Sequence, residues 1–291
     1  NFTRDEYQRA VARAIDYIAA GDVFQVNLAQ RFTTEVPGAF PIEPRAMFAR
    51  LANTSPAWYG AYLEWPAPGR SESGHGTTPK VAARPRAVLS TSPELFLSVD
   101  PHRRVVTRPI KGTRPASDTA DALRRSLKDE AELNMIVDLM RKDLRRVCEY
   151  GSVRVTDPRA IESHPTVHHG VATIEGRLHA SKSIVDLLRA TLPGGSVTGA
   201  PKVRAMQIID ELEPARRGPY CGAIGWLMRD AACFNVAIRT MLYEQVSPGR
   251  ARVDFSVGGG IVADSQPAAE YQETLDKAAA MMAALRQVAA V

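Results

Sequence analysis

The sequence predicts an α+β fold. Segments with the alternating or β-branched apolar residues of strands come in runs, and segments with apolar residues at helical spacing lie between the runs instead of following each strand. The chain has 291 residues, of which 45% are hydrophobic, so it can bury a substantial core. No internal repeat and no linker divides it, and we therefore expect residues 1–291 to form a single domain.

Charge and cysteine content narrow the class of function. The formal net charge is +5, but the basic residues are scattered and form no stripe with aromatic residues, which favours capture of a small anion over nucleic acid. Three cysteines without a pairing pattern are typical of a reducing cytosol. The sequence has no signal peptide and no apolar run of about 18 residues, the length of a membrane span. These features predict a cytoplasmic protein that binds neither nucleic acid nor membranes. Because Asn1 already lies in a helix signal, we expect further sequence to precede it.

Helical spacing of apolar residues recurs along the chain. The first helix opens with the capping box Thr3–Glu6 and stops at Gly21, and Pro201 opens another helix at its first turn. Further helices are predicted near Arg45–Ala52, Asp129–Tyr150 and Ser183–Thr191 and from Pro267 to the end.

Strands are predicted where apolar residues alternate with polar ones or are β-branched. In the first strand, Gln25, Asn27 and Gln30 make a polar face. The predicted strands lie near Val23–Phe32, Trp58–Trp65, Ala87–Val99, Val105–Ile110, Val153–Ile161, Val167–Leu178, Tyr220–Arg229, Cys233–Gln245 and Arg252–Val257. The segment Pro66–Arg86 is rich in proline, glycine, serine and threonine, which predicts an exposed, mobile loop.

One lysine stands in an unusual local setting. In the segment Arg108–Pro115, a β-branched strand leads Lys111 onto a tight glycine turn between two prolines. A surface turn with a solvated lysine would have the same pattern. If the lysine is instead partly buried beside other cations, such as Arg108 and Arg114, its pKa falls and its amine becomes a nucleophile. The spacing alone leaves both interpretations open.

Glu94 follows Ser92 and Pro93 between apolar strand segments. A glutamate at a strand edge that faces water is one interpretation. Against apolar walls its pKa would rise, and the carboxyl group could act as a general acid.

Two acidic pairs stand on predicted helices. Glu273 and Lys277 share a face of the last helix, with Glu270 one turn earlier, and Asp129 and Glu132 open the long helix. Such spacing is typical of exposed ion pairs, but carboxylates are also the oxygen ligands that Mg²⁺ takes. Sequence spacing does not show whether the two acidic pairs meet in space.

Two glycine-rich stretches look like nucleotide-binding loops but miss the motifs. After Gly258–Gly260 the residues predict a helix, whereas a dinucleotide fold needs a second strand with an acidic residue about 20 residues later. In Gly194–Lys202, Ala200 stands where a phosphate-binding loop has lysine. Bare backbone N–H groups near a helix start suit a carboxylate as well as a phosphate.

His168 and His169 are neighbours in a predicted strand. Their side chains therefore point to opposite faces and cannot hold one metal together. One of them can be catalytic and the other structural.

Together these segments resemble the family of chorismate-utilising enzymes, which includes anthranilate synthase large subunits and aminodeoxychorismate, isochorismate and salicylate synthases. The likeness covers nearly the whole chain, and the stretches Pro193–Leu212 and Gly258–Lys277 are highly specific. Other matching stretches are Gly21–Phe32, Ser92–Glu94, Pro109–Thr113, Ala131–Leu139, Val167–Gly170, Tyr220–Trp226 and Ile238–Thr240. The resemblance implies two large, mainly antiparallel β-sheets packed together with helices outside, in agreement with the α+β prediction.

Two positions favour the aminodeoxychorismate synthases within this family. Gln25 stands where the water-using members carry a lysine as general base, which indicates ammonia as the nucleophile. Lys111 stands where anthranilate synthases have alanine. The resemblance implies that Lys111 attacks C2 of chorismate while Glu94 protonates the leaving C4 hydroxyl. Ammonia, supplied by a glutamine amidotransferase subunit or fused domain, would then attack C4 to give 4-amino-4-deoxychorismate.

The resemblance also assigns binding residues. Glu132 and Glu273 would be Mg²⁺ ligands, with Asp129 and Glu270 holding metal-bound waters. His169 would lie near the reacting ring. The expected substrate-binding residues are Gly112, Thr113, Tyr220, Arg239, Gly258, Gly259, Gly260 and Lys277. The guanidinium group of Arg239 suits a bidentate grip on a carboxylate.

Two alternatives stay open. Anthranilate synthase is the first, because a single lysine carries most of the distinction. A non-catalytic domain of the same fold is the second, although the joint presence of Glu94, Lys111, Glu132 and Glu273 argues against it.

Overall fold

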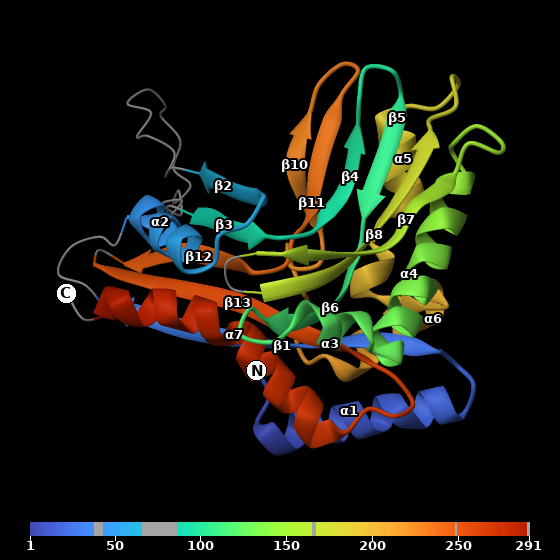
Figure 1. Ribbon diagram of the computed structural model, residues 1–291. Coiled ribbons are helices and arrows are strands. Elements are labelled where there is room, and N and C mark those ends of the chain that lie inside the picture. Colours follow the sequence, from blue (N-terminus) through green and yellow to red (C-terminus); the bar gives the residue numbers. More distant parts are fainter. Residues whose placement is uncertain (38–42, 66–85, 165–166, 248, 290–291) are drawn as a thin grey trace, which may run out of the picture.

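The computed structural model describes residues 1–37, 43–65, 86–164, 167–247 and 249–289. They form two antiparallel sheets whose strands run in different directions, with helices on the outside (Figure 1). The helices are α1 (Arg4–Ala19), α2 (Pro44–Thr54), α3 (Ala120–Arg124), α4 (Leu127–Arg145), α5 (Ile184–Thr191), α6 (Lys202–Leu212) and α7 (Pro267–Ala289). The predicted α+β architecture is confirmed. Residues 66–85, where a loop was predicted, lie outside the described residues.

The first sheet has six strands in the order β2-β3-β12-β13-β1-β9. Its strands are β1 (Gln25–Pro37), β2 (Tyr59–Trp65), β3 (Arg86–Ser92), β9 (Gly199–Ala200), β12 (Thr240–Ser247) and β13 (Arg250–Ile261). The longest pairing joins β1 to β13, from Val26 opposite Ile261 to Pro37 opposite Arg250. Helices α1, α2 and α7 lie along this sheet (Figure 1).

The second sheet has seven strands, in the order β10-β11-β4-β5-β8-β6, with β7 also paired to β8. Its strands are β4 (Leu95–Val99), β5 (Arg104–Arg108), β6 (Ile110–Pro115), β7 (Arg154–Ser163), β8 (Val167–Arg177), β10 (Ala223–Leu227) and β11 (Ala232–Val236). Helix α4 packs against β8 and β6 on its outer side (Figure 1).

At two neighbouring points the chain passes from one sheet directly into the other, without a helix between the strands. The prediction of continuous strands is wrong there: residues 87–99 divide into β3 and β4, and residues 233–245 divide into β11 and β12. Both halves of each segment are buried in their own sheet, so apolar residues continue across the position where one strand ends and the next begins. The sequence pattern therefore does not mark that position. The Ser92 hydroxyl donates to the Val236 carbonyl at 2.6 Å, and the Val236 N–H donates to the Glu94 carbonyl at 3.0 Å. These bonds hold the two crossings side by side.

Three apolar clusters support this arrangement. The largest lies under the second sheet and includes Leu133 and Ile136 of α4. The next lies between the first sheet and helices α2 and α7, where Met281 is buried. The third joins α1 and α6 to β1. Helices α4 and α7 thus belong to different cores.

The polar face predicted for the first strand is only partly right. Gln25 lies on the inner face of β1, but Gln30 lies on the other face, where its amide donates to the Thr274 hydroxyl of α7. Alternation along an unbroken strand puts positions 25 and 30 on opposite sides.

Candidate active site

Lys111 lies within strand β6, and the tight turn predicted at this point is wrong. The register between β6 and β8 shifts between Ile110 and Thr113, which is a β-bulge. Gly112 makes the bulge possible because its φ is +78°, a backbone conformation that other residues rarely adopt. Opposite the bulge, a Cβ on Gly170 would lie 2.6 Å from the Lys111 carbonyl oxygen. The glycine therefore lets the two strands approach at the lysine.

The amine of Lys111 is withdrawn from water. Its side chain is 12% exposed, and Nζ lies 4.0 Å from Oε2 of Glu132. Burial is the main cause that lowers the pKa of Lys111, the charge of Lys277 lowers it further, and Glu132 opposes the shift. A lowered pKa makes the neutral, nucleophilic amine more available at neutral pH.

The cations predicted to act on Lys111 are not the ones that do so. Arg108 pairs with Glu162, and Arg114 pairs with Asp129 at 2.8 Å, so each guanidinium is neutralised by its own carboxylate. The cation that lowers the pKa of Lys111 is instead Lys277 of helix α7, near the end of the sequence.

Glu94 lies at the crossing from β3 to β4 and is 4% exposed. Burial raises the pKa of its carboxyl group to about 7, against a hydrogen bond from the Ser196 side chain and the charge of Lys111. Near neutral pH this group is therefore divided between its acid and its anion. That is the range in which a carboxyl group can give up and take back a proton efficiently.

Gln25 reaches the same place from β1. The residue is 1% exposed, and its Oε1 atom has no hydrogen-bond partner among the described residues. A Cβ on Gly260 would lie 2.0 Å from Gln25 Nε2 and 3.4 Å from Lys111 Nζ. Gln25, Lys111 and the backbone of Gly260 therefore meet, and a buried acceptor without a donor points to a missing ligand.

His169 and Arg239 form another wall. The ring Nδ1 of His169 lies 2.9 Å from Oγ1 of Thr113. Burial, followed by the charge of Arg239, lowers the pKa of His169 to about 3, so the imidazole is neutral. Arg239 has a φ of +48° and a pKa lowered by burial. Strained backbone at a non-glycine residue is typical of functional sites.

The adjacent histidine faces the other way, as predicted. The ring of His168 contacts the Ser163 hydroxyl at 2.8 Å and the Asp118 carbonyl at 3.2 Å, on the opposite face of β8 from His169 and Thr113.

The two acidic pairs meet across the two sheets. Burial raises the pKa of Glu132, and the charges of Asp129 and Glu273 raise it further. Burial likewise raises the pKa of Glu270, and Glu273 adds to the shift. Carboxylates from α4 and α7 are thus close enough to repel one another, which the sequence spacing could not show.

Cations and bare backbone surround this cluster. Nζ of Lys277 lies 2.6 Å from Oε1 of Glu273 and donates to the Gly258 carbonyl at 2.9 Å. Burial raises the pKa of Glu273, but Lys277 and other lysines outweigh it and hold that pKa below its usual value. A Cβ on Gly259 would lie 3.1 Å from Glu270 Oε2. The glycine run therefore brings backbone against the carboxylates.

Comparisons with known proteins agree with this geometry. A family model described as chorismate binding enzyme matches residues 1–283. The chain belongs to the chorismate-binding enzyme family. It is 45% identical to aminodeoxychorismate synthase component 1 of Klebsiella aerogenes, over 95% of this chain and 57% of that protein. It is 41% identical to anthranilate synthase component 1 of Thermus thermophilus, over 100% of this chain and 58% of that protein.

A solved structure supports the same assignment. The fold matches the crystal structure of anthranilate synthase component I from Streptococcus pneumoniae with a TM-score of 0.78 and 36% identity, over 97% of this chain and 58% of that one. The chain thus spans a little over half the length of these relatives. Within the described residues, no helix combines the length and apolar character of a membrane span.

The carboxylate cluster of this family member fits a hard divalent cation. Within the described ranges, no three histidine, cysteine, aspartate or glutamate side chains are arranged as a ready-made metal site. Mg²⁺ does not require one, because it keeps several waters and is bound through one or two carboxylates plus substrate oxygens. Burial, and then the charges of Asp129 and Glu273, raise the pKa of Glu132, and a cation among these carboxylates would offset their mutual repulsion. Glu132 and Glu273 are therefore suitable ligands.

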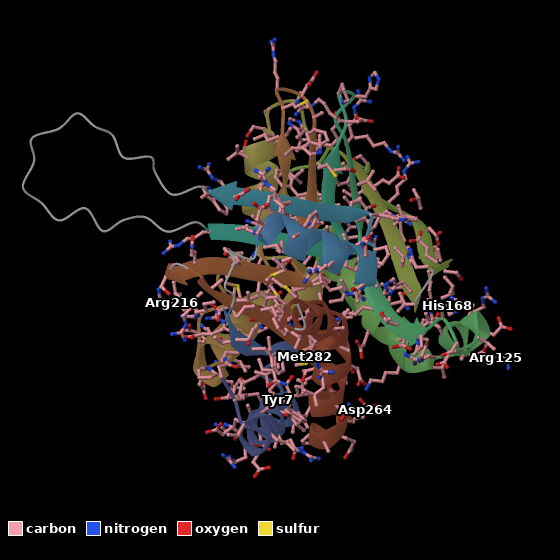
Figure 2. All side chains as sticks on the ribbon, turned by 90° about the vertical axis from the view of Figure 1, so that its left-hand side faces the viewer. Tyr7, Arg125, His168, Arg216, Asp264 and Met282 are labelled. Atoms are coloured by element: carbon pink, nitrogen blue, oxygen red, sulfur yellow. The ribbon has the colours of Figure 1, made fainter. Side chains whose placement is uncertain are left out.

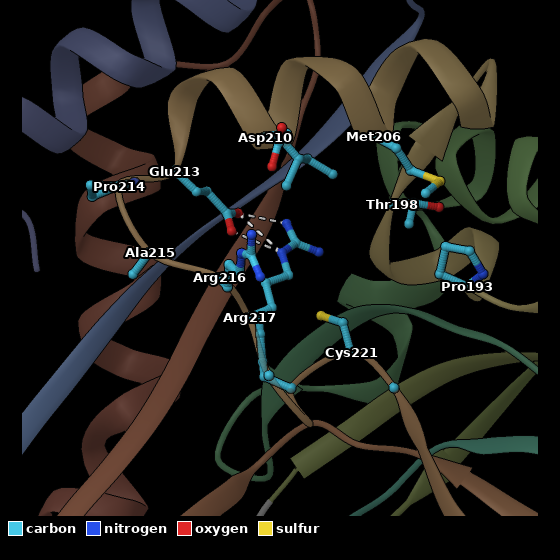
Figure 3. Close-up of a pocket in the computed structure, with 14 residues that line it drawn as sticks. Pro193, Thr198, Met206, Asp210, Glu213, Pro214, Ala215, Arg216, Arg217 and Cys221 are labelled. Atoms are coloured by element: carbon cyan, nitrogen blue, oxygen red, sulfur yellow. Dashed lines mark hydrogen bonds and ion pairs between the residues drawn. The ribbon is translucent and has the colours of Figure 1, made fainter.

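Tyr220 lies apart from this cluster. It is buried at 9% exposure and lines a hollow of about 620 Å³ beside α6 that also includes Cys221, Glu213 and Arg217. Figure 3 shows Glu213 and Arg217 paired in the hollow. Burial raises the pKa of Cys221 to about 12, and Glu94 contributes to that shift. Tyr220 and Cys221 therefore line the hollow, and Cys221 is close enough to Glu94 to be affected by its charge.

Sequence reasoning missed three residues at the site. Ser196 donates to Glu94, and Ser265 donates to Glu270 at 2.6 Å. Lys128 acts on the carboxylate cluster from α4. Only Lys128 had a readable signal, because it stands one helical turn before Glu132.

Proposed function

We propose that this chain catalyses the Mg²⁺-dependent amination of chorismate at C4, giving 4-amino-4-deoxychorismate. The observation that carries the proposal is the buried amine of Lys111, whose pKa is lowered and which lies 4.0 Å from Glu132. The relatives named aminodeoxychorismate synthase component 1 support it. Because the chain spans 57% of the first of them, the activity of the whole protein is part of the proposal.

In the first step, the neutral amine of Lys111 bonds to C2 of chorismate. Both ring double bonds shift toward C4, the C4–O bond breaks, and the proton of Glu94 leaves with the hydroxyl group as water. The pKa of about 7 for Glu94 supports this role, because the acid form is available near neutral pH.

In the second step, ammonia bonds to C4 as both ring double bonds shift back and Lys111 leaves C2. The new C4 ammonium group returns one proton to Glu94, so the carboxyl group is ready for the next cycle. The partnerless Oε1 of Gln25 can accept an N–H of ammonia and direct its lone pair. No bond to the enolpyruvyl group breaks, so pyruvate stays attached.

Binding residues surround this chemistry. Glu132 and Glu273 would hold Mg²⁺, with Asp129 and Glu270 on its bound waters, and the ion would supply positive charge to a substrate carboxylate. Arg239 would grip a carboxylate through its fork of N–H groups. The backbone of Gly258–Gly260, with Gly112, Thr113 and Lys277, would complete the substrate site, with His169 beside the ring and Tyr220 on the side of the neighbouring hollow.

Anthranilate synthase is the second candidate. The Thermus thermophilus relative of that name matches the full length of this chain at 41% identity. In that reaction the same site would aminate C2 and release pyruvate.

The product decides between the two candidates. Purified chain is incubated with chorismate, MgCl₂ and an ammonium salt, which replaces an amidotransferase partner, and products are identified by mass. We expect 4-amino-4-deoxychorismate without pyruvate. The Lys111→Ala variant should lose this product to the assay background, whereas Lys142→Ala, an exposed lysine on α4, should retain it. Anthranilate with pyruvate from the unaltered chain, or full amination by Lys111→Ala, would contradict the proposal.

A further inference from the structure

The two helices that carry the carboxylate cluster share no apolar core. Residues of α4 such as Leu133 and Ile136 belong to the cluster under the second sheet, whereas Met281 of α7 belongs to the cluster under the first. Within the described residues, one ion pair joins α4 to the segment between β13 and α7, and it links Lys128 Nζ to Asp264 Oδ1 at 3.9 Å. Polar groups therefore set how the two acidic pairs face each other.

Lys128 lies on the carboxylate side of α4. It stands four residues before Glu132 in α4, so the two side chains share a face of the helix. Its charge acts on both helices: it lowers the pKa of Glu132, Glu270 and Glu273, although burial is the larger cause for each. This lysine is therefore a cation of the cluster as well as a partner of Asp264.

The two side chains of this ion pair are largely exposed to solvent. Lys128 is 49% exposed and Asp264 is 72% exposed, and Figure 2 shows Asp264 at the surface near α7. An exposed pair at this distance contributes little binding energy of its own. The ammonium group can therefore move between Asp264 and the carboxylates at small cost.

A count of charges shows why this movement matters. The four carboxylates Asp129, Glu132, Glu270 and Glu273 lie among four basic side chains, which are Arg114, Lys111, Lys277 and Lys128. Lys111 is the weakest of these as a cation, because burial lowers its pKa. Three of these cations lie within 4.0 Å of a cluster carboxylate, but the ion partner of Lys128 stands outside the cluster. A divalent cation that enters this site is repelled by the positive charges already there. The repulsion is smallest for a charge that can move away from the carboxylates, and Lys128 is the one whose ion partner allows this.

We propose that Lys128 is a positioning residue that competes with the divalent cation for the carboxylate cluster, and that Asp264 holds its ammonium group aside when the cation is bound. The proposal rests on the proposed function only for the identity of the cation as Mg²⁺. The proposal predicts that removing the charge of Lys128 and removing the carboxylate of Asp264 change the affinity for Mg²⁺ in opposite directions.

Calorimetric titration of the full chain with MgCl₂, without substrate, tests this prediction. Lys128→Met should tighten Mg²⁺ binding by about three- to tenfold, because a nearby like charge is gone. Asp264→Asn should weaken binding by a similar factor, because Lys128 then stays with the carboxylates. Lys142→Met, which removes the same charge further along α4, should leave the affinity unchanged.

Thermal unfolding in a chelator gives a second measurement. Without a divalent cation, Lys128→Met leaves the four carboxylates with one positive neighbour fewer and should lower the melting temperature. Added Mg²⁺ should then raise the melting temperature more than in the unaltered chain. Unchanged or weaker Mg²⁺ binding by Lys128→Met, or unchanged binding by Asp264→Asn, would overturn the proposal. Absence of Mg²⁺ binding by the unaltered chain would overturn it too. A chain that binds Mg²⁺ with these opposite shifts but makes anthranilate would leave this inference standing and remove the proposed function.

Discussion

The site has a buried half and an open half, and they differ in how their charges are controlled. In the buried half, Gln25 is 1% exposed, Glu94 4% and His169 2%. In the open half, the side chains of Lys277 and Glu273 are 43% and 51% exposed. Glu132 lies where the halves meet, at 17% exposure, beside Lys111.

This difference in exposure corresponds to two different chemical roles, catalysis in the buried half and binding of charged ligands in the open half. Burial is the largest single cause of the pKa shifts in both halves, but in the buried half no other cause outweighs it, and it prepares an acid near pH 7 and a neutral imidazole. In the open half, lysines outweigh burial and keep Glu273 anionic. Dehydrated groups suit fixed proton transfer and nucleophilic attack, whereas hydrated, paired charges suit an ion and a substrate that must enter and leave. The following changes test that division.

The largest effect is expected at Glu94. Glu94→Gln removes the acid that protonates the leaving hydroxyl, and the amination rate should fall by about 100- to 10,000-fold. In the unaltered chain the rate should fall as pH rises through about 7, because the acid form is lost. The pH profile of kcat measures both effects.

The variant should lose this alkaline decline along with its activity. Glu149→Gln, at an exposed pair with Arg177, is the control and should keep both the rate and the profile. A Glu94→Gln variant with an unchanged profile would show that another group supplies the proton.

A smaller effect concerns His169 and stability. The pKa of His169 is lowered from 6.5 to about 3 in the folded chain, so below pH 6.5 the unfolded chain binds one more proton at this residue. Folding stability at this residue is therefore present above that pH and is lost as pH falls toward 3. His169→Gln should reduce the slope of unfolding free energy against pH by about 1.4 kcal/mol per pH unit in this range.

Urea unfolding at a series of pH values measures this slope. His168→Gln, on the opposite face of β8, serves as the matched control. An identical slope for His169→Gln and the unaltered chain would mean that the ring of His169 is hydrated. His169 would then not belong to the buried half of the site.

The open half was easier to predict than the buried half. Helix periodicity alone put Glu273 and Lys277 on one face, and they form the ion pair that this spacing indicates. The strand interpretation failed where the chain changes sheets, because apolar residues fill both sides of each crossing. The position of Glu94 depends on that crossing and on a partner strand more than 130 residues away, and no local pattern carries such information.

The chemical properties of a site residue could be predicted where its residue type and the family resemblance agreed. Which charged side chains pair with one another could not be predicted. The lowered pKa of Lys111 was anticipated, but the cations expected to cause it, Arg108 and Arg114, are taken up by Glu162 and Asp129. Partner choice depends on side-chain directions in the folded sheet, which spacing does not fix. The roles of the site residues stay predictions until the variants are measured.

The smallest effect tests the joint between the halves, at Gly112. A Cβ there would lie 2.7 Å from Leu123 Cδ1 and 2.9 Å from Asp129 Cγ, at a φ of +78°. Gly112→Ala should cost about 2–3 kcal/mol of unfolding free energy, from backbone strain and from the clash. Gly151→Ala is a matched control, because its φ is +75° with nothing within 4 Å of the added Cβ. It should cost about 1 kcal/mol of unfolding free energy from backbone strain alone.

Urea unfolding measures both changes in unfolding free energy. Titration with MgCl₂ should show weaker binding for Gly112→Ala only, since Asp129 must move. Equal costs with unchanged Mg²⁺ affinity would mean that the bulge at Lys111 and the carboxylate cluster are not mechanically joined.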